Sequence, residues 1–239
     1  MDIARKGEGL SLVVAVHGIQ GTRAVWLPVA QALESDATFI LPNPRGRGQA
    51  ARGSSAQDYG LRAFASDLSD AIDAGVGERP YWLAGWSMGV SVALEYLSGA
   101  GARLPEGVIL VSGTPAIREV RWFTAEDDES LLREIAAREK RLALSEAADH
   151  DAVAWTWQAI RSTDQRAVLE RLDIPTLILH GSEDTDCPSS CAGSLVEKIR
   201  GAQWQIFADA GHSLPVTHVD VVANAIRRFL GHFFFAEFT

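Results

Sequence analysis

The residue with the clearest potential for chemistry is the serine of the segment Gly85-Trp86-Ser87-Met88-Gly89. An apolar run, 81–84, comes directly before this segment, and a helical pattern, 91–98, follows it. A serine on a sharp strand-to-helix turn takes a strained backbone that lifts its hydroxyl above the sheet, and this needs small flanking residues. The pattern predicts that Ser87 is a nucleophile. The competing interpretation is a serine that caps the first turn of its own helix.

Two residues that could activate this serine follow later in the chain. A serine hydroxyl is a poor nucleophile at neutral pH until an imidazole accepts its proton and a carboxylate orients that imidazole. Asp184 lies in the loop after the strand-like segment 174–180, and His212 lies in the loop after the strand-like segment 203–207. We therefore expect Ser87, Asp184 and His212 to be the catalytic residues.

A loop near the N-terminus offers the remaining part of such a site. The apolar run 12–16 is typical of a parallel strand buried on both faces, and it ends at His-Gly-Ile-Gln-Gly, residues 17–21. Acyl transfer places negative charge on the former carbonyl oxygen, and backbone amides aimed at that oxygen lower the barrier. The expected donors of this oxyanion hole are the amides of Ile19 and Met88.

Together, these motifs resemble the α/β-hydrolase superfamily over nearly the whole chain, from His17 to about Phe229. The resemblance rests on five features in order: HG-x-x-G from His17, Pro-Arg-Gly-Arg-Gly at 44–48, the serine pentapeptide, G-x-x-D-x-x-x-P at 181–188, and Gly211-His212. It implies a small capped serine esterase, thioesterase, lactonase or carbon–carbon hydrolase that acts on a carboxylic-acid derivative.

The choice of aspartate depends on this resemblance. Glu183 and Asp186 lie within two residues of Asp184 and offer the same chemistry. Relatives place a proline four residues after their catalytic aspartate, and Pro188 has that spacing. Asp184 is therefore the expected partner of the histidine.

The chain also departs from the superfamily pattern. Relatives have two further N-terminal strands, whereas only ten residues precede Ser11, so we expect this edge of the sheet to be shortened. Asn43 stands where relatives commonly carry aspartate, and this difference is expected to be structural. A serine nucleophile argues against the dehalogenase and epoxide hydrolase branches, which need a carboxylate.

The remaining pattern predicts an α/β fold, a doubly wound and mostly parallel sheet with an inserted helical cap. Strand-like runs alternate with helical patterns, except in the stretch 116–171, which indicates helices only. We expect 1–115 and 172–239 to form the hydrolase core and 116–171 to form the cap. Within the cap, Glu134 and Arg138 are expected to form an i,i+4 pair on the solvent side.

Several side chains are candidates for substrate contact. Trp122 and Trp155, in the cap, favour an apolar or ring-bearing substrate, and Arg121 could bind a substrate carboxylate because its planar fork suits one. The alternative is that the tryptophans join cap to core and that the arginine is a solvated surface residue. Arg45 and Arg47, in a glycine-flanked loop, allow the same two interpretations.

Composition limits the partners and the location. The chain has 239 residues, a net charge of −9 and a pI near 5.1, which disfavour nucleic acid and an anionic membrane surface as partners. It has no apolar stretch long enough to span a membrane and no signal-peptide core in residues 1–7. We expect a cytoplasmic protein in which Cys187 and Cys191 are reduced thiols. No metal or organic cofactor is expected.

The C-terminal segment 231–239, Gly-His-Phe-Phe-Phe-Ala-Glu-Phe-Thr, is unusually apolar for a tail. Left in water, its phenylalanines would form an exposed apolar patch. We expect the tail to be buried, either against the shortened sheet edge or against a second copy in a homodimer.

These observations predict a serine hydrolase that cleaves a carboxylic ester, thioester or lactone of a small apolar or ring-bearing acid through an acyl-enzyme on Ser87. Two alternatives stay open. The same residues could cleave a carbon–carbon bond or an amide, because the cap and nearby polar groups decide how the substrate is held. A protein of this fold could also bind a small ligand without turning it over.

Overall fold

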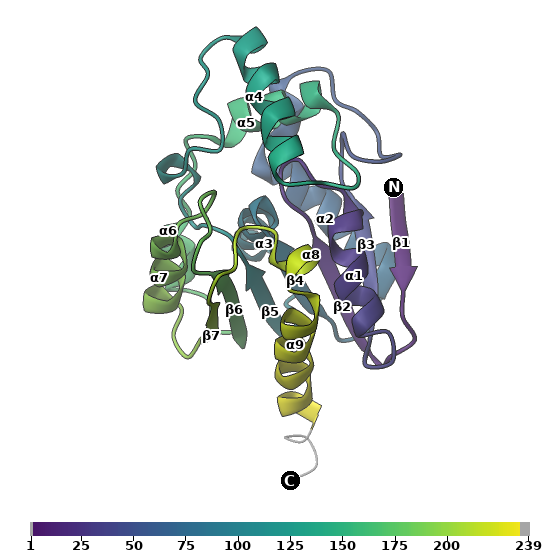
Figure 1. Cartoon of the computed structure of the whole chain (residues 1–239). Helices are drawn as coiled ribbons and strands as arrows, with labels where there is room; N and C mark the ends of the chain where they lie inside the picture. The colour runs from purple at the N-terminus through teal and green to yellow at the C-terminus, as the bar shows by residue number, and fades with distance from the viewer. Residues whose placement is uncertain (1, 235–239) are drawn as a thin grey trace.

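In the described residues, seven short strands join in one sheet in the order β1-β3-β2-β4-β5-β6-β7 (Figure 1). The computed structural model describes residues 2–234. From β3 to β7 all neighbouring strands are parallel, and β1 runs antiparallel to β3. The predicted α/β fold with a mostly parallel sheet is thus confirmed. The strands are β1 Asp2–Lys6, β2 Ser11–Val16, β3 Ala37–Asn43, β4 Trp82–Trp86, β5 Gly107–Val111, β6 Thr176–Gly181 and β7 Gln203–Phe207.

The inner strands are buried on both faces, which explains their continuous apolar sequences. Every residue of β2 is buried, and successive side chains enter opposite layers. Val13 and Ala15 pack in one core, and Val14 and Val16 pack in the other. The sheet therefore separates two apolar layers, each of which needs helices to cover it.

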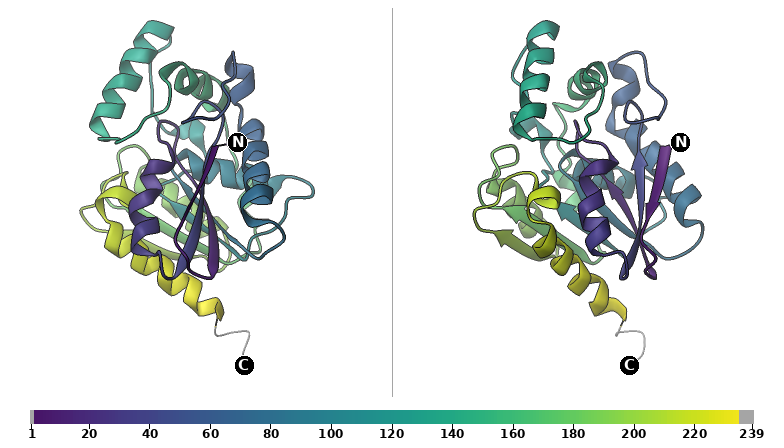
Figure 2. Two further views of the ribbon diagram at one scale, coloured as in Figure 1. Left: turned by 90° about the vertical axis from the view of Figure 1, so that its right-hand side faces the viewer. Right: turned by 45° about the vertical axis from the view of Figure 1, so that its right-hand side comes forward.

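Helices α1 and α9 cover one face of the sheet, and α2, α3 and α7 cover the other (Figures 1 and 2). On the first face, the ring of Phe229 meets the ring of Trp82 edge-on, with 5.2 Å between the centroids. The helices of these layers and their connections are η1 Arg23–Trp26, α1 Leu27–Ala32, η2 Ala56–Tyr59, α2 Leu61–Val76, α3 Met88–Ser98, α7 Ser189–Lys198, α8 Leu214–Thr217 and α9 Val219–Phe234.

One antiparallel strand, β1, forms the N-terminal edge, so this edge is shortened as the sequence predicts. The Asp2 carboxylate anchors it by pairing with Arg23 and by accepting hydrogen bonds from Asn43 Nδ2 at 2.9 Å and from the Gln49 amide at 2.8 Å. An aspartate at position 43 would bring a second carboxylate against Asp2. Asparagine at this position therefore suits the edge that this chain has.

Two longer helices, α4 (Asp128–Arg141) and α5 (His150–Ile160), lie beyond the carboxyl ends of the parallel strands (Figure 2). Asp127 and Asp149 cap them, because each carboxylate accepts a hydrogen bond from the amide three residues later. The short helices η3 (Ile117–Glu119) and α6 (Arg166–Leu169) connect them with β5 and β6. Helix α5 packs on α4 and on η2, so this layer rests on the segment that follows β3.

In the described range 2–234, no helix is both long enough and apolar enough to cross a membrane. Most of the apolar tail 231–239, for which we expect burial, lies outside the described residues. The backbone of α9 is described as far as Phe234.

Candidate active site

Ser87 occupies the turn between β4 and α3 with a backbone that few residues adopt, φ 57° and ψ −121°. The glycines on either side have no room for a side chain. A Cβ on Gly85 would come within 2.5 Å of the Gly89 carbonyl oxygen, and a Cβ on Gly89 would come within 2.3 Å of the Val16 carbonyl oxygen. The glycine spacing is therefore a packing requirement of this turn, as its sequence pattern predicts.

Ser87, His212 and Asp184 form a continuous row of hydrogen bonds. The Ser87 hydroxyl lies 2.9 Å from His212 Nε2, and His212 Nδ1 lies 2.8 Å from Asp184 Oδ2 and 3.0 Å from Oδ1. A carboxylate only accepts, so Nδ1 donates to Asp184 and leaves Nε2 free to accept the serine proton. We refer to these three side chains as the Ser-His-Asp row.

Further hydrogen bonds hold Asp184 and His212 in this row. Asp184 Oδ1 accepts hydrogen bonds from the amides of Asp186 at 2.9 Å and Cys187 at 2.8 Å. The indole of Trp86 donates to the His212 carbonyl oxygen at 2.9 Å, and its ring lies 5.2 Å from the imidazole. The histidine ring is thus fixed from two sides.

Among the three neighbouring acids, the structure places Asp184 beside the histidine. Glu183 is exposed. Asp186 is buried but points to two guanidinium groups, those of Arg138 and Arg141. The atoms of Asp184, Asp186 and His212 that could bind a metal lie within 4.8 Å of one another, yet all three side chains are already engaged in the bonds described here.

The loop 17–21 packs directly against the serine. A Cβ on Gly18 would lie 3.0 Å from Ser87 Cβ and 2.9 Å from the Trp86 ring, so the loop backbone comes as close as a glycine permits. Ile19 follows and is buried. Met88 is the first residue of α3, where an amide has no partner within its own helix. Both predicted oxyanion donors therefore lie in segments that adjoin Ser87.

His17 supports this loop as a neutral side chain. It is fully buried, and burial lowers its pKa to about 3. Its Nδ1 donates to the Gly18 carbonyl oxygen at 2.9 Å. A neutral, inward-facing imidazole of this kind fixes the backbone and adds no charge.

Arg47 is a buried guanidinium that holds the same loop. Its Nη2 donates to the Ile19 carbonyl oxygen at 2.7 Å and to Thr156 Oγ1, on α5, at 3.2 Å, and Nη1 donates to the Arg45 carbonyl oxygen at 3.0 Å. Within residues 2–234 no carboxylate lies at ion-pair distance from it, and burial lowers its pKa to about 10. The sequence placed Arg47 among the site candidates but gave no sign of this burial.

Arg138 contradicts the sequence-based expectation of a solvent-side pair with Glu134. Its side chain is only 5% exposed, and Nε donates to Asp186 Oδ1 at 2.7 Å. Glu134 instead accepts hydrogen bonds from the amide and hydroxyl of Thr124. The predicted pair is wrong because Arg138 binds the buried carboxylate of Asp186, 48 residues away in sequence. An ion pair shielded from water is stronger than one with an exposed glutamate.

Asp186 is held as an anion by this contact. Burial acts to raise its pKa, but hydrogen bonds from Arg141 and the charge of Arg138 outweigh it and keep the pKa below the usual range. Arg141 binds it through Nη1 and Nη2, both at 2.9 Å. No pattern in the sequence distinguished this aspartate from its neighbours.

The three side chains predicted to contact substrate lie in different parts of the structure. Trp122 is buried, stacks against Trp157 at 5.9 Å and donates its indole N–H to the Asp186 carbonyl oxygen at 3.1 Å. Trp155 packs instead on Tyr59, 5.8 Å away, and Arg121 is exposed at the surface. Trp122 is therefore the one that lies next to the loop of Asp184.

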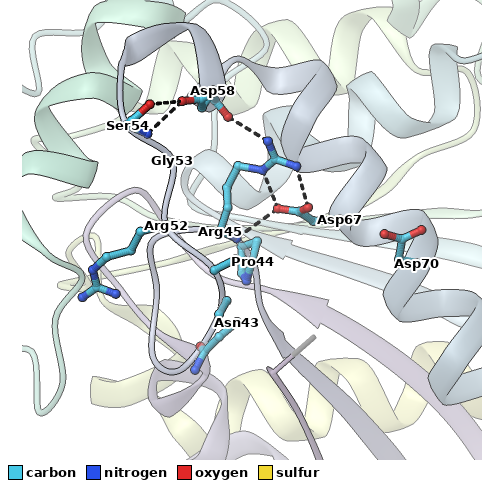
Figure 3. A pocket seen from close by; sticks show the side chains of 11 residues that line it. Asn43, Pro44, Arg45, Arg52, Gly53, Ser54, Asp58, Asp67 and Asp70 are labelled. Carbon is cyan, nitrogen blue, oxygen red and sulfur yellow. Dashed lines mark hydrogen bonds and ion pairs between the residues drawn. The ribbon is translucent and has the colours of Figure 1, made fainter.

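A pocket of about 570 Å³ lies away from the Ser-His-Asp row, between the loop after β3 and helix α2 (Figure 3). In it, Arg45 forms a two-pronged ion pair with Asp67 at 2.8 Å and donates to the Asp58 carbonyl oxygen. Its lining contains no member of the row. Arg45 is thus a structural brace of this loop rather than a free cation.

Each residue of the row is enclosed. Ser87 is 1% exposed, Asp184 4% and His212 5%.

Both cysteines are also buried free thiols, and burial raises the pKa of Cys187 and Cys191.

Known proteins resemble this chain over most of its length. A putative non-heme chloroperoxidase from Synechocystis sp. is 26% identical, with 91% of this chain and 90% of that protein covered. A putative carbamate hydrolase RutD from Klebsiella pneumoniae is 27% identical, with 89% and 88% covered. A pimeloyl-[acyl-carrier protein] methyl ester esterase from Nitrosomonas europaea is 25% identical, with 88% and 92% covered.

Solved structures repeat the fold. An esterase from Exiguobacterium antarcticum superposes with a TM-score of 0.81 at 21% identity, over 96% of this chain and 94% of that one. The family model described as "Alpha/beta hydrolase family" matches residues 13–225, which include most of β2, all of β3 to β7 and all three residues of the Ser-His-Asp row. This chain therefore belongs to the α/β-hydrolase family.

Proposed function

We propose that the protein is a serine hydrolase that cleaves a carboxylic ester, thioester or lactone of a small apolar or ring-bearing acid. The observation that carries the proposal is the Ser-His-Asp row: Ser87 Oγ lies 2.9 Å from His212 Nε2, and His212 Nδ1 lies 2.8 Å from Asp184. A serine in a strained turn, with its proton acceptor already in place, is arranged for nucleophilic attack.

The reaction proceeds in two halves. As Ser87 Oγ bonds to the substrate carbonyl carbon, His212 Nε2 takes the serine proton, and the bond to the leaving oxygen or sulfur then breaks as that atom receives the proton. In the second half, water gives a proton to His212 and attacks the acyl carbon, which releases the acid and restores the serine hydroxyl. The substrate and one water molecule are the only reactants consumed, and Ser87 and His212 return to their starting protonation states.

Asp184 and the oxyanion donors stabilise the charges that form during this reaction. The imidazolium formed in each half is stabilised by Asp184, whose own orientation is fixed by the amides of Asp186 and Cys187. The negative charge on the former carbonyl oxygen is stabilised by the amides of Ile19 and Met88. Enclosure of the row strengthens both effects because it excludes water.

A fluorophosphonate probe and 4-nitrophenyl esters of increasing acyl length test the proposal. Ser87→Ala should lose labelling and lose turnover by several orders of magnitude, with the melting temperature unchanged. Ser91→Ala is the matched control, since Ser91 is also a buried serine near the start of α3 but donates to the Thr114 carbonyl oxygen. Folded wild type that neither reacts with the probe nor hydrolyses any ester would contradict the proposal and favour a binding protein.

Cleavage of a carbamate or amide by the same residues is the second candidate, favoured by the likeness to the putative carbamate hydrolase of Klebsiella pneumoniae. Matched 4-nitrophenyl substrates, one a butyrate ester and one an N-propylcarbamate, separate the two. Repeated turnover of the ester, with the carbamate trapped after a single turnover, supports ester cleavage. Repeated turnover of the carbamate at a higher kcat/KM supports the second candidate.

A further inference from the structure

Arg138 of α4 has a buried nitrogen without a partner beside the Ser-His-Asp row. Its Nε donates to Asp186 Oδ1 and its Nη1 donates to Gln20 Oε1, each at 2.7 Å. The third nitrogen, Nη2, is buried and has no hydrogen-bond partner in the described part of the chain. A buried donor group without an acceptor costs stability, so a position of this kind calls for an explanation.

Arg138 and Arg141 share one carboxylate as their ion-pair partner. Asp186 contacts both guanidinium groups, and no other carboxylate in the described residues lies at ion-pair distance from either of them. Asp184 lies close to Asp186 but is hydrogen-bonded to His212. Arg141 is 53% exposed and therefore solvated, whereas Arg138 is 5% exposed and depends on its buried acceptors. A buried guanidinium with an unused N–H donor is suited to bind a further anionic oxygen.

The position of Arg138 connects this charge with the proposed reaction. Through Gln20 it contacts the residue next to Ile19, on the oxyanion loop. Through Asp186 it contacts the loop of Asp184, and one carboxylate oxygen of Asp186 lies within 4.8 Å of a ring nitrogen of His212. The guanidinium thus spans both walls of the site, and Nη2 is the nitrogen left between these two bonded edges.

Aromatic rings line the same place. The guanidinium carbon of Arg138 lies 5.9 Å from the ring centre of Trp122 and 5.7 Å from that of Phe123. Both side chains are buried and contact Trp157. The site therefore offers an apolar wall and, at one point in it, a cationic N–H donor.

We propose that the substrate carries a carboxylate besides its scissile ester or thioester, and that Arg138 Nη2 binds this carboxylate. This inference rests on the proposed function and narrows its substrate class to esters or thioesters that carry a free carboxylate on the acyl or the leaving side. Bound in this way, the carboxylate would orient the scissile carbonyl toward Ser87, while the apolar part of the substrate lies against the aromatic rings.

The test compares substrates that differ only in charge. One pair has the extra group on the acyl side: 4-nitrophenyl half-esters of dicarboxylic acids of increasing length, beside their half-amides and corrected for spontaneous hydrolysis. The other has it on the leaving side: 4-carboxyphenyl acetate beside 4-carbamoylphenyl acetate. We expect a preference for the carboxylate of about 10- to 100-fold in kcat/KM in one of the pairs, which also locates the anion site on the acyl or the leaving side.

Arg138→Gln and Arg141→Gln form the matched variants, because both arginines bind Asp186 but Arg141 is 53% exposed. Arg138→Gln should reduce the preference to about one, whereas Arg141→Gln should retain it. If Arg138→Gln does not fold, Arg138→Lys serves instead: it keeps the charge, loses the free N–H₂, and should lower the preference.

Three outcomes would overturn the anion site while the proposed function stands: equal rates within both pairs in wild type, a preference that survives Arg138→Gln, or one that Arg138→Lys leaves undiminished. If no ester reacts at all, the proposed function fails instead. In that case calorimetric binding of adipate decides the anion site. Binding that Arg138→Gln abolishes and Arg141→Gln preserves supports it, and absence of binding to wild type overturns it.

Discussion

Two buried guanidinium groups, those of Arg47 and Arg138, contact the loop 17–21, and their charges are compensated differently. Arg138 shares a carboxylate with a second arginine, whereas Arg47 has neutral acceptors, among them the carbonyl oxygen of Ile19 and the hydroxyl of Thr156. A buried cation without a carboxylate is costly. Its presence is explained if it acts on the proposed reaction, in which it would fix Ile19, the proposed oxyanion donor, and add positive potential where negative charge develops.

We therefore expect Arg47→Met to lower kcat by about 10- to 100-fold with little change in KM. Without Arg47 the Ile19 amide would no longer be held in place to stabilise the oxyanion, and this interaction forms mainly in the transition state. Steady-state kinetics on a neutral 4-nitrophenyl ester measure this, together with the affinity of a boronic-acid inhibitor that mimics the tetrahedral intermediate. Thr156→Val is the control, since it removes another hydrogen bond of Arg47 and leaves the bond to Ile19. A rise in KM with unchanged kcat would show that Arg47 acts on substrate binding instead.

At the scale of elements, the β4–α3 turn is the part of the site with the least tolerance. Replacing Gly89 by alanine would place a Cβ 2.3 Å from the Val16 carbonyl oxygen, so β2 and α3 would have to separate. We expect Gly89→Ala to destabilise the fold by roughly 1–3 kcal/mol and to abolish ester turnover.

Gly193→Ala is the matched control for this element. Gly193 lies within α7, and a Cβ there would meet no atom within 4 Å. The substitution should stabilise the fold by about 0.5–1 kcal/mol, because alanine loses less backbone freedom in a helix. Denaturant unfolding of both variants checks the prediction, and similar stabilities for the two would contradict it.

Elements whose cause lies in the local sequence could be predicted, whereas some contacts between segments far apart in the sequence could not. The turn at Ser87 and the buried inner strands were predictable because glycine spacing and continuous apolar runs reflect the backbone itself. The position of Arg138 was not, because its periodicity fits a solvent-facing i,i+4 pair equally well. Its partner Asp186 lies on a loop that only the folded sheet brings near.

At the scale of the whole molecule, the loop 17–21 is one of the segments that join the layer of α4 and α5 to the sheet. The side chain of Gln20 donates to the Ile135 carbonyl oxygen and accepts from Arg138. The backbone carbonyl oxygen of Gln20 accepts from the Ala148 amide. Residues of the helical layer are thus bonded directly beside Ile19. The loop that carries Ile19, the proposed oxyanion donor, is therefore held in part by the helices α4 and α5.

The stability of this enclosed structure should fall as the pH is lowered below neutrality. Burial lowers the pKa of His17 from its ordinary value of 6.5 to about 3, and burial also lowers the pKa of His180. Between pH 6.5 and 3 the unfolded chain therefore binds a proton at His17 that the folded chain does not. The contribution of His17 to stability is complete above pH 6.5 and is lost on acidification through that range, with a slope of up to about 1.4 kcal/mol per pH unit.

Urea unfolding of wild type and His17→Asn at a series of pH values from 7.5 to 4.5 measures this slope. Asparagine at this position can still donate to the Gly18 carbonyl oxygen but does not titrate, so we expect a shallower pH dependence whatever the variant's stability at neutral pH. His218→Asn, which alters a partly exposed histidine, should keep the wild-type slope. A His17→Asn protein with the full wild-type slope would show that other groups, and not this imidazole, couple the oxyanion loop to acid unfolding.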